Sequence, residues 1–228
     1  TDAIAGKSPD AGGEIRVDCP ECEGGQRDTL GVNTTTGAYH CFRCDFRGNY
    51  LKKKGSDNKP KAQFLLEQAR PVKTHPYTEK KQIRPDKILQ DKYGNWVTPY
   101  HDSAGRLQTL QLISLDQKIF LKGLGVTGSS YKINGTTDVV YVCEGPATGH
   151  SIHEATGNKV YCVSGKENFK HVLPWVKAKH KTVILAADHD PTGLKAAREA
   201  AIQNGLKIIA PPNPGMDFND LAIDAGLD

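Results

Sequence analysis

The chain has 228 residues, an apolar content of 37% and a formal net charge of +4 at pH 7. This length allows one or two compact domains with linkers. The sequence contains no run of about 18 apolar residues, so no membrane span is expected. Its first residues show no charged segment followed by an apolar stretch, so no secretory signal is visible. A net charge this small does not establish a nucleic-acid partner, so the distribution of residues along the chain has to be examined.

Two cysteine pairs mark the N-terminal segment, Cys19-Pro-Glu-Cys22 and Cys41-Phe-Arg-Cys44. Between Cys22 and Cys41 lie 18 residues, a spacing typical of a structural zinc site in which two C-x₂-C knuckles face each other. Because four thiolates complete a tetrahedral shell, we predict one structural Zn²⁺. His40, next to Cys41, is an alternative ligand, but an exposed polar residue is the favoured interpretation. Two disulfides are the alternative, and the absence of a visible secretory signal disfavours them.

Short strands are predicted at residues 29–32 and 37–40, within a zinc ribbon that spans residues 1–51. Aromatic and basic side chains alternate around the second knuckle. Such side chains can stack on bases and neutralise the phosphates of a single strand. Some of the aromatics must instead cover the small core, and Phe42 or Tyr39 is the expected choice. The candidate DNA-binding residues are Tyr39, Phe42, Arg43 and Arg47.

The composition changes to Lys, Gln, Pro and Ser over residues 52–82. Between Lys52 and Lys61 there are five lysines and one acid, Asp57. We interpret this stretch as a flexible basic linker, with a short helix near residues 62–69. A lysine-rich linker lowers the cost of approaching a polyanion, although a merely solvated linker has the same composition.

Short apolar runs separated by turns follow in residues 83–137. They predict a small, mostly antiparallel β-subdomain. Residues 123–128 match G-x-G-x-x-G, but the sequence after them is typical of a strand and not of a helix. We therefore interpret this match as a turn and not as a dinucleotide site.

From Asp138 onward, predicted strands and helices alternate regularly. This alternation predicts an α/β domain over residues 138–228, with a mainly parallel sheet of about four strands. Cys143 and Cys162 lie within strand patterns and are expected to be buried core thiols, and His150 is expected on a helix surface. The expected strands are 139–143, 159–163, 182–186 and 206–209, and the expected helices are 147–155, 167–178, 191–204 and a last one after Asp217.

Three carboxylates follow two of these strands. Glu144 ends the first strand, and Asp188 and Asp190 follow the third, one residue apart. Ligands of open α/β sheets bind beyond the carboxyl ends of the strands, where uncompensated carboxylates would repel one another. The pattern therefore predicts a hard divalent cation, Mg²⁺ or Mn²⁺. Glu144 alone would be interpreted as a surface acid, and Lys166, after the second strand, is a further candidate for this pocket.

A family resemblance rests on the same residues. Glu144-Gly145 before a helix, and Asp188-His-Asp190-Pro-Thr-Gly193, resemble the Toprim domain of bacterial DnaG-type primases, topoisomerases and some nucleases. Gly-Met-Asp217-Phe-Asn-Asp220-Leu resembles the later acidic motif of primase Toprim domains. The usual second acid of that motif falls at Asn219 here. The resemblance implies that Asp217 is a further metal ligand, with Asp220 as the alternative.

The resemblance covers almost the whole chain. The two cysteine knuckles are similar to the zinc-binding domains of primases, with cysteine where the commonest DnaG pattern has histidine. Residues 99–106 and 118–123 resemble the basic subdomain that precedes Toprim in DnaG-type and phage primases. This likeness implies that Arg106, Lys118 and Lys122 hold nucleotide phosphates or the template backbone.

The implied activity is that of a DNA primase, which makes short RNA primers on single-stranded DNA from ribonucleoside triphosphates. Asp188 and Asp190 would bind one of two or more catalytic Mg²⁺ or Mn²⁺ ions. Glu144 would hold a metal or assist deprotonation of the attacking 3′-hydroxyl. Asp217 would hold a further metal, while Lys118, a catalytic candidate, would neutralise phosphate charge with Arg106.

The resemblance also implies a bacterial cytoplasmic setting, with phage or mobile-element origin as one source, and a replicative helicase as partner. That helicase would be fused or separate, because this chain has no G-x-x-x-x-G-K-[ST] motif. A Toprim nuclease would use the same acids but has no obvious need for the ribbon. A scaffold of the RecR type joins four cysteines to Toprim and only binds DNA, but it typically lacks the complete acid set.

Overall fold

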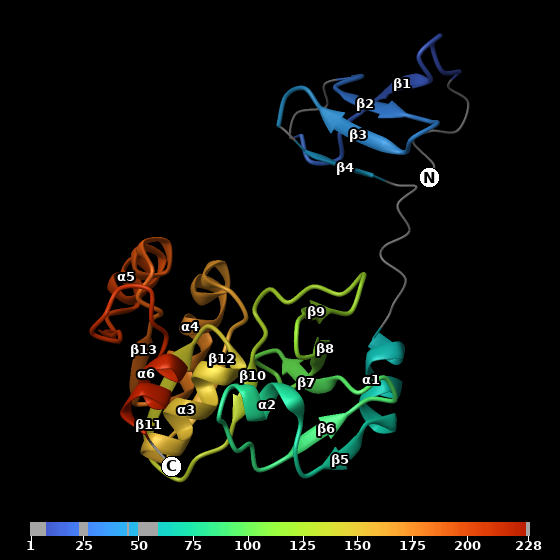
Figure 1. Cartoon of the computed structure of the whole chain (residues 1–228). Helices are drawn as coiled ribbons and strands as arrows, with labels where there is room; N and C mark the ends of the chain where they lie inside the picture. The colour runs from blue at the N-terminus through green and yellow to red at the C-terminus, as the bar shows by residue number, and fades with distance from the viewer. Residues whose placement is uncertain (1–7, 23–26, 45, 50–58, 227–228) are drawn as a thin grey trace. The chain divides into compact units, whose positions relative to one another are not determined.

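The computed structural model describes residues 8–22, 27–44, 46–49 and 59–226. The chain divides into two compact units, Thr1–Asp57 and Asn58–Asp228 (Figure 1). None of the helices in these described ranges combines the length and apolar composition needed to span a bilayer.

The N-terminal unit is a four-stranded antiparallel sheet in the order β1-β2-β3-β4. The side-chain oxygen of Asn33 accepts hydrogen bonds from the backbone N–H groups of Thr35 and Thr36, which closes the β2–β3 turn. Two of the strands were predicted within one residue, whereas β1 and β4 were not. The strands are β1 (Glu14–Val17), β2 (Leu30–Asn33), β3 (Ala38–Cys41) and β4 (Arg47–Asn49).

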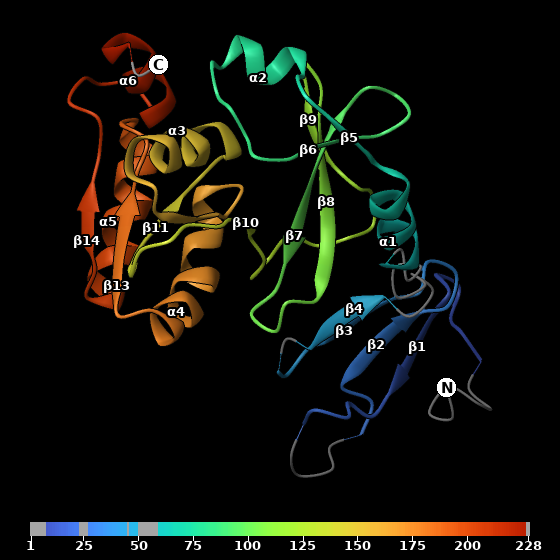
Figure 2. The same ribbon diagram turned by 90° about the horizontal axis from the view of Figure 1, so that it is seen from below.

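The second unit begins with a five-stranded antiparallel sheet whose strands follow chain order, β5-β6-β7-β8-β9 (Figure 2). The mostly antiparallel subdomain predicted over residues 83–137 is confirmed for β6 to β9, whereas β5 lies in the segment predicted to be a linker. The elements are α1 (Lys59–Gln68), β5 (Arg70–Val72), α2 (Pro76–Lys80), β6 (Ile88–Gln90), β7 (Trp96–His101), β8 (Leu107–Ile113) and β9 (Lys118–Phe120).

The short helix predicted near residues 62–69 is confirmed as α1, but the flexible linker predicted over residues 52–82 is wrong from Lys59 onward. Helix α1 buries Ala62 completely against Val97 and Leu110 of the sheet, and β5 pairs with β6. Helix α2 starts at His75, whose Nδ1 accepts a hydrogen bond from the backbone of Tyr77. The part of the predicted linker before residue 59 lies outside the described residues.

The remaining elements form an α/β domain around a second five-stranded sheet, in the order β10-β12-β11-β13-β14. Four of its strands are parallel, and β10, which we had assigned to the preceding subdomain, is an antiparallel edge strand paired with β12. The predicted βα alternation is confirmed. The elements are β10 (Tyr131–Ile133), β11 (Val139–Cys143), α3 (Pro146–Thr156), β12 (Lys159–Cys162), the 3₁₀ helix η2 (Lys166–Asn168), α4 (Phe169–Lys179), β13 (Thr182–Ala186), α5 (Pro191–Asn204), β14 (Lys207–Ile209) and α6 (Phe218–Ala225).

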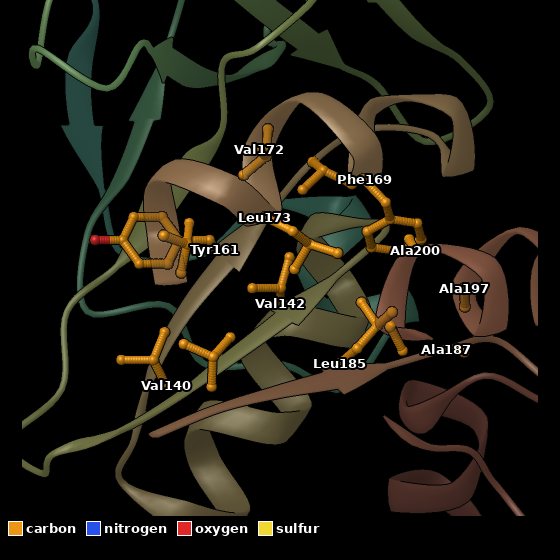
Figure 3. Close-up of a cluster of buried hydrophobic side chains, with 14 residues drawn as sticks. Val140, Val142, Tyr161, Phe169, Val172, Leu173, Leu185, Ala187, Ala197 and Ala200 are labelled. Atoms are coloured by element: carbon orange, nitrogen blue, oxygen red, sulfur yellow. The ribbon is translucent and has the colours of Figure 1, made fainter. Parts of the chain in front are cut away.

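Helices α4 and α5 cover one face of this sheet, and α3 and α6 lie together on the other (Figures 1 and 2). Successive side chains of a strand point to opposite sides of the sheet, so alternate residues of β11 pack on its two faces. Val140 and Val142 pack towards α4 and α5 with Leu185 of β13 (Figure 3). The sheet is therefore buried on both faces, which fixes the positions of the strand ends.

The α3 face contains the two cysteines that were predicted to be core thiols. Cys143 and Cys162 are fully buried, with sulfur atoms 3.8 Å apart. Gly149 of α3 lies so close that an added Cβ would be 2.4 Å from the sulfur of Cys162. The expectation that His150 lies on the helix surface is wrong, because this histidine is buried against Trp96 and Tyr131.

Candidate functional site

The four N-terminal cysteines converge on one point. Their sulfur atoms all lie within 4.8 Å of one another, and the Cys19–Cys44 and Cys22–Cys41 separations are 3.6 Å. These separations exceed a disulfide bond, and all four cysteines are free. Four sulfur donors in a compact group fit the closed tetrahedral shell of a structural zinc ion.

The aromatic residues of the ribbon divide into a buried and an exposed set. Tyr39 and Phe46 pack against each other and against the ribbon core. Phe42 is 61% exposed, and the guanidinium of Arg16 lies 4.2 Å from its ring centroid. Of the two aromatics expected to cover the core, Tyr39 therefore does so and Phe42 does not.

Four acids lie at the carboxyl end of the Toprim-like sheet. Glu144 follows β11 and Asp188 follows β13, and these strands are adjacent and parallel. Asp190 and Asp217 are the N-cap residues of α5 and α6. The sheet thus brings together residues that are far apart in the sequence.

Asp188 lies where the charges of these acids converge. Burial and the negative charges of Glu144, Asp217 and Asp190 raise the pKa of its carboxyl group to about 7. Its Oδ1 atom is buried and has no hydrogen-bond partner among the described residues. A buried, unpartnered carboxylate oxygen in a negative field fits a hard divalent cation. Mg²⁺ or Mn²⁺ bound by Asp188 and its neighbours matches this donor set.

Two lysines act on the same acids. Burial and the charge of Asp190 raise the pKa of Glu144, and the charges of Lys166 and Lys118 oppose that rise. The ammonium of Lys166 donates to the hydroxyl of Thr192 at 2.6 Å, and this hydroxyl donates to Asp190 at 2.6 Å. Lys166 is therefore joined to Asp190 through Thr192, whereas Lys118 acts on Glu144 through its charge.

Two of the acids also cap helices, a role that the sequence analysis missed. Oδ1 of Asp190 accepts from the backbone N–H groups of Thr192 and Gly193. The hydroxyl of Thr192 and the backbone of Gly193 are the main causes that lower the pKa of Asp190. Asp217 and Asp220 form a reciprocal capping box on α6. The signals were an acid before Pro-Thr-Gly and the spacing D-x-x-D.

Asn219 takes a structural role at the position where the related motif has an acid. Its side-chain amide donates to the carbonyl of Lys81 at 2.7 Å and to the hydroxyl of Ser151 at 3.0 Å, which an ionised carboxylate could not do. The charge of Asp217 raises the pKa of Asp188 more than that of Asp220. Asp217 is therefore the better candidate for the later metal ligand.

Arg106 does not join this site. It lies beside the β7–β8 turn, where its Nε atom is 2.8 Å from a carboxylate oxygen of Asp102. Lys118 pairs with Ile113 at the other end of β8, and a seven-residue strand separates its ends by roughly 20 Å. Arg106, just before β8, and Lys118, on the neighbouring strand β9, thus lie beside opposite ends of β8. Lys122 lies just beyond β9.

The Toprim domain family matches residues 139–228. This part of the chain is a Toprim domain, preceded by a β-rich region and by a cysteine cluster consistent with a zinc ribbon. The predicted fold class is therefore confirmed.

The solved structures that are similar to this chain include several primases. A structure of the Aquifex aeolicus primase, with its zinc-binding and RNA polymerase domains, has a TM-score of 0.51 and 12% identity, and covers 96% of this chain and 77% of its own. For the primase domains of bacteriophage T7 the TM-score is 0.44 and the sequence identity 19%, and the match covers 66% of this chain and 81% of the T7 chain. For the E. coli primase catalytic core the TM-score is 0.42 and the identity 14%, and the match covers 76% of this chain and 59% of the E. coli chain. The Aquifex likeness shows a shared fold, as the resemblance predicted.

Proposed function

We propose that this chain is a DNA primase, which joins ribonucleotides into short RNA on a single-stranded DNA template. The observation that carries the proposal is Asp188, half-buried among other acids at the Toprim sheet edge with an unpartnered oxygen and a raised pKa. A carboxylate in this setting favours a divalent cation, and nucleotidyl transfer depends on such cations. The ribbon and the antiparallel subdomain favour a polymerase over a nuclease.

The acids would hold the catalytic ions. Glu144, Asp188, Asp190 and Asp217 offer the carboxylate oxygens for two or more Mg²⁺ or Mn²⁺ ions. When bound, these ions supply positive charge that offsets the triphosphate and the leaving pyrophosphate. Asp190 and Asp217 are fixed by their capping bonds, so their positions do not depend on the ligand.

The lysines would bind the substrate. Lys118 and Lys166 both act on Glu144, and each can hold a phosphate oxygen of the ribonucleoside triphosphate. In the reaction, the 3′-oxygen of the growing RNA forms a bond to the α-phosphorus while the bond to pyrophosphate breaks. Glu144 either contributes to ion binding or accepts the proton that the 3′-hydroxyl loses.

The ribbon would bind the template. Its exposed ring, Phe42, and the exposed Arg43 and Arg47 provide a stacking surface and positive charge. Tyr39 supports this surface from the core side. A structural zinc ion held by the four cysteines would keep the second knuckle, which carries Phe42 and Arg43, in place.

The test is incubation of the full chain with labelled ribonucleotides, Mg²⁺ or Mn²⁺, and varied single-stranded templates. We expect short RNA from the wild type and from Asp224→Asn, a control on the exposed side of α6, but not from Asp188→Asn. Shortened templates would instead indicate a nuclease. DNA binding with neither product would indicate a scaffold, and either result would overturn the proposal.

A further inference from the structure

Helix α2, from the segment expected to be a linker, contacts α6 at its C-terminal end and Lys118 of β9 near its N-terminal end. At its C-terminal end, the carbonyl of Lys81 accepts from the side chain of Asn219. The ammonium of Lys81 lies 3.8 Å from a carboxylate oxygen of Asp220. Near its N-terminal end, α2 presents the ring of Tyr77 to Lys118, whose Nζ is 5.1 Å from the ring centroid.

The two partners of this last contact differ in mobility. Tyr77 is 4% exposed and packs against Trp96, with ring centroids 6.1 Å apart. Its backbone N–H is also bound by the imidazole of His75. Lys118 is exposed on β9, the last strand of its sheet. A free lysine side chain of this kind samples many rotamers, which costs entropy when it binds a ligand.

We propose that Tyr77 is a positioning residue, whose ring face holds the Lys118 ammonium beside Glu144, ready to bind the triphosphate of the incoming nucleotide. This inference rests on the proposed function for the identity of the ligand. An ammonium within about 6 Å of an aromatic centroid is attracted to the ring face. The contact therefore holds the Lys118 ammonium against a ring whose buried cluster includes Ala147, in the first turn of α3 and three residues after Glu144. The charge of Lys118 also opposes the raised pKa of Glu144.

The ring of Tyr77, and not its hydroxyl, positions the Lys118 ammonium. The hydroxyl of Tyr77 is buried and has no hydrogen-bond partner within the described part of the chain. Tyr77→Phe keeps the ring face and removes an unsatisfied polar atom, so Lys118 should stay in place. Tyr77→Leu removes the ring face and releases the ammonium.

Binding of ATP with Mg²⁺, measured by calorimetry on the full chain, tests the inference. Tyr77→Leu should weaken ATP binding about 3- to 30-fold, the range that a cation–π contact provides, and Tyr77→Phe should bind like the wild type. Tyr93→Leu is the matched control, because Lys92 lies 4.9 Å from the Tyr93 centroid on a ring that is 75% exposed. It should leave ATP affinity unchanged.

A double-mutant cycle separates positioning from lost packing. In a Lys118→Gln background, Tyr77→Leu should cause no further loss of ATP affinity if it acts through Lys118. Packing lost around the buried ring would weaken binding in both backgrounds. Equal losses in the two backgrounds, or wild-type affinity in Tyr77→Leu, would overturn the inference.

A spectroscopic readout keeps this inference distinct from the proposed function. The ring of Tyr77 should shift the side-chain NMR signals of Lys118, and this shift should persist in Tyr77→Phe and vanish in Tyr77→Leu. A wild type that shows the shift and binds ATP, yet makes no RNA, would overturn the primase proposal alone. The absence of the shift in the wild type would overturn the role of Tyr77 alone.

Discussion

The zinc ribbon and the acid edge of the Toprim sheet both gather ligand atoms, but they do so differently. The four cysteine sulfur atoms lie within 4.8 Å of one another, and within the described ranges they are the one group of three or more such residues that is this compact. The acids meet at one edge without reaching that compactness. Asp190 and Asp217 are held by helix caps, and Asp188 keeps an unpartnered oxygen.

The cysteine cluster is thus a site that can stabilise a fold, whereas the acids at the sheet edge repel one another. Cys19 and Cys41 are buried in the ribbon core and Cys22 packs against it, so a metal ion held by this cluster would couple its binding to the folding of the ribbon. The acids belong to a domain with its own large apolar core. That core can tolerate a raised pKa at Asp188, which a cation would relieve.

The largest effect is expected from Cys41→Ser, which removes a ligand from the compact site. Structural zinc contributes about 10–16 kcal/mol in small zinc domains, so the ribbon should lose its zinc and unfold. Residues 58–228 form a separate compact unit and should keep their thermal transition. Zinc analysis and calorimetry measure both results. Cys162→Ala, in the Toprim core, is the control that should retain zinc, and full zinc retention by Cys41→Ser would contradict the assignment.

Asp188→Asn should break the second site without unfolding it. Removal of one group that stabilises charge at a reacting centre costs about 10²- to 10³-fold in rate, so primer synthesis should fall by about that range. Because the substitution removes a repelled charge, the thermal stability of the metal-free protein should rise at neutral pH. A variant that is both inactive and less stable would indicate a structural role for Asp188.

The same carboxylate should make the stability of the metal-free protein depend on pH. Its pKa is raised from 3.8 to about 7 in the folded chain, so the folded state binds the proton more tightly than the unfolded state. Stability should therefore fall as the pH rises from about 4 to about 8, and then level off. A shift of about three pH units sets an upper limit of about 4 kcal/mol, which solvent screening of this half-buried group lowers. Denaturant unfolding in EDTA measures this slope. Asp188→Asn should flatten it, and an unchanged slope in that variant would assign it to other groups.

The sequence was most informative where the signal is local. The spacing of Cys19, Cys22, Cys41 and Cys44 predicted the sulfur cluster. The apolar runs before Glu144 and Asp188 predicted two strands of a mainly parallel sheet, and the structure shows that these strands are neighbours. Backbone geometry then carries each acid to the carboxyl end of the sheet.

The sequence was least informative for segments whose structure depends on the strand or helix that they pair with or pack against. The helix near residues 62–69 was predicted, but its packing was not. Ala62, Leu65 and Leu66 of α1 join a core, and the Lys and Gln residues around them favoured the interpretation of a linker. Strand β5 contains Pro71 and exists because β6 pairs with it. The local sequence of β10 is compatible with a strand in either sheet, and its assignment follows from its pairing with β12 in the tertiary structure. The Tyr77–Lys118 contact joins α2, in the segment predicted to be a linker, to β9, and no local signal indicates that these two segments meet.

The smallest expected effect separates the two acids of the last helix. Asn caps a helix about as well as Asp, so Asp217→Asn and Asp220→Asn should both preserve the capping box and remove only charge. Asp217 acts more strongly on Asp188, and Asp220 lies 3.8 Å from Lys81 at a partly exposed position.

Asp217→Asn should therefore raise the Mg²⁺ concentration for half-maximal primer synthesis about tenfold, as weakened metal sites commonly do. Asp220→Asn should change this concentration little, because an exposed ion pair contributes about 0–1 kcal/mol. Mg²⁺ titration of both variants at equal thermal stability measures the difference. The reverse order would place Asp220 in the metal site and leave Asp217 as a cap, because charge is the one property that each substitution removes.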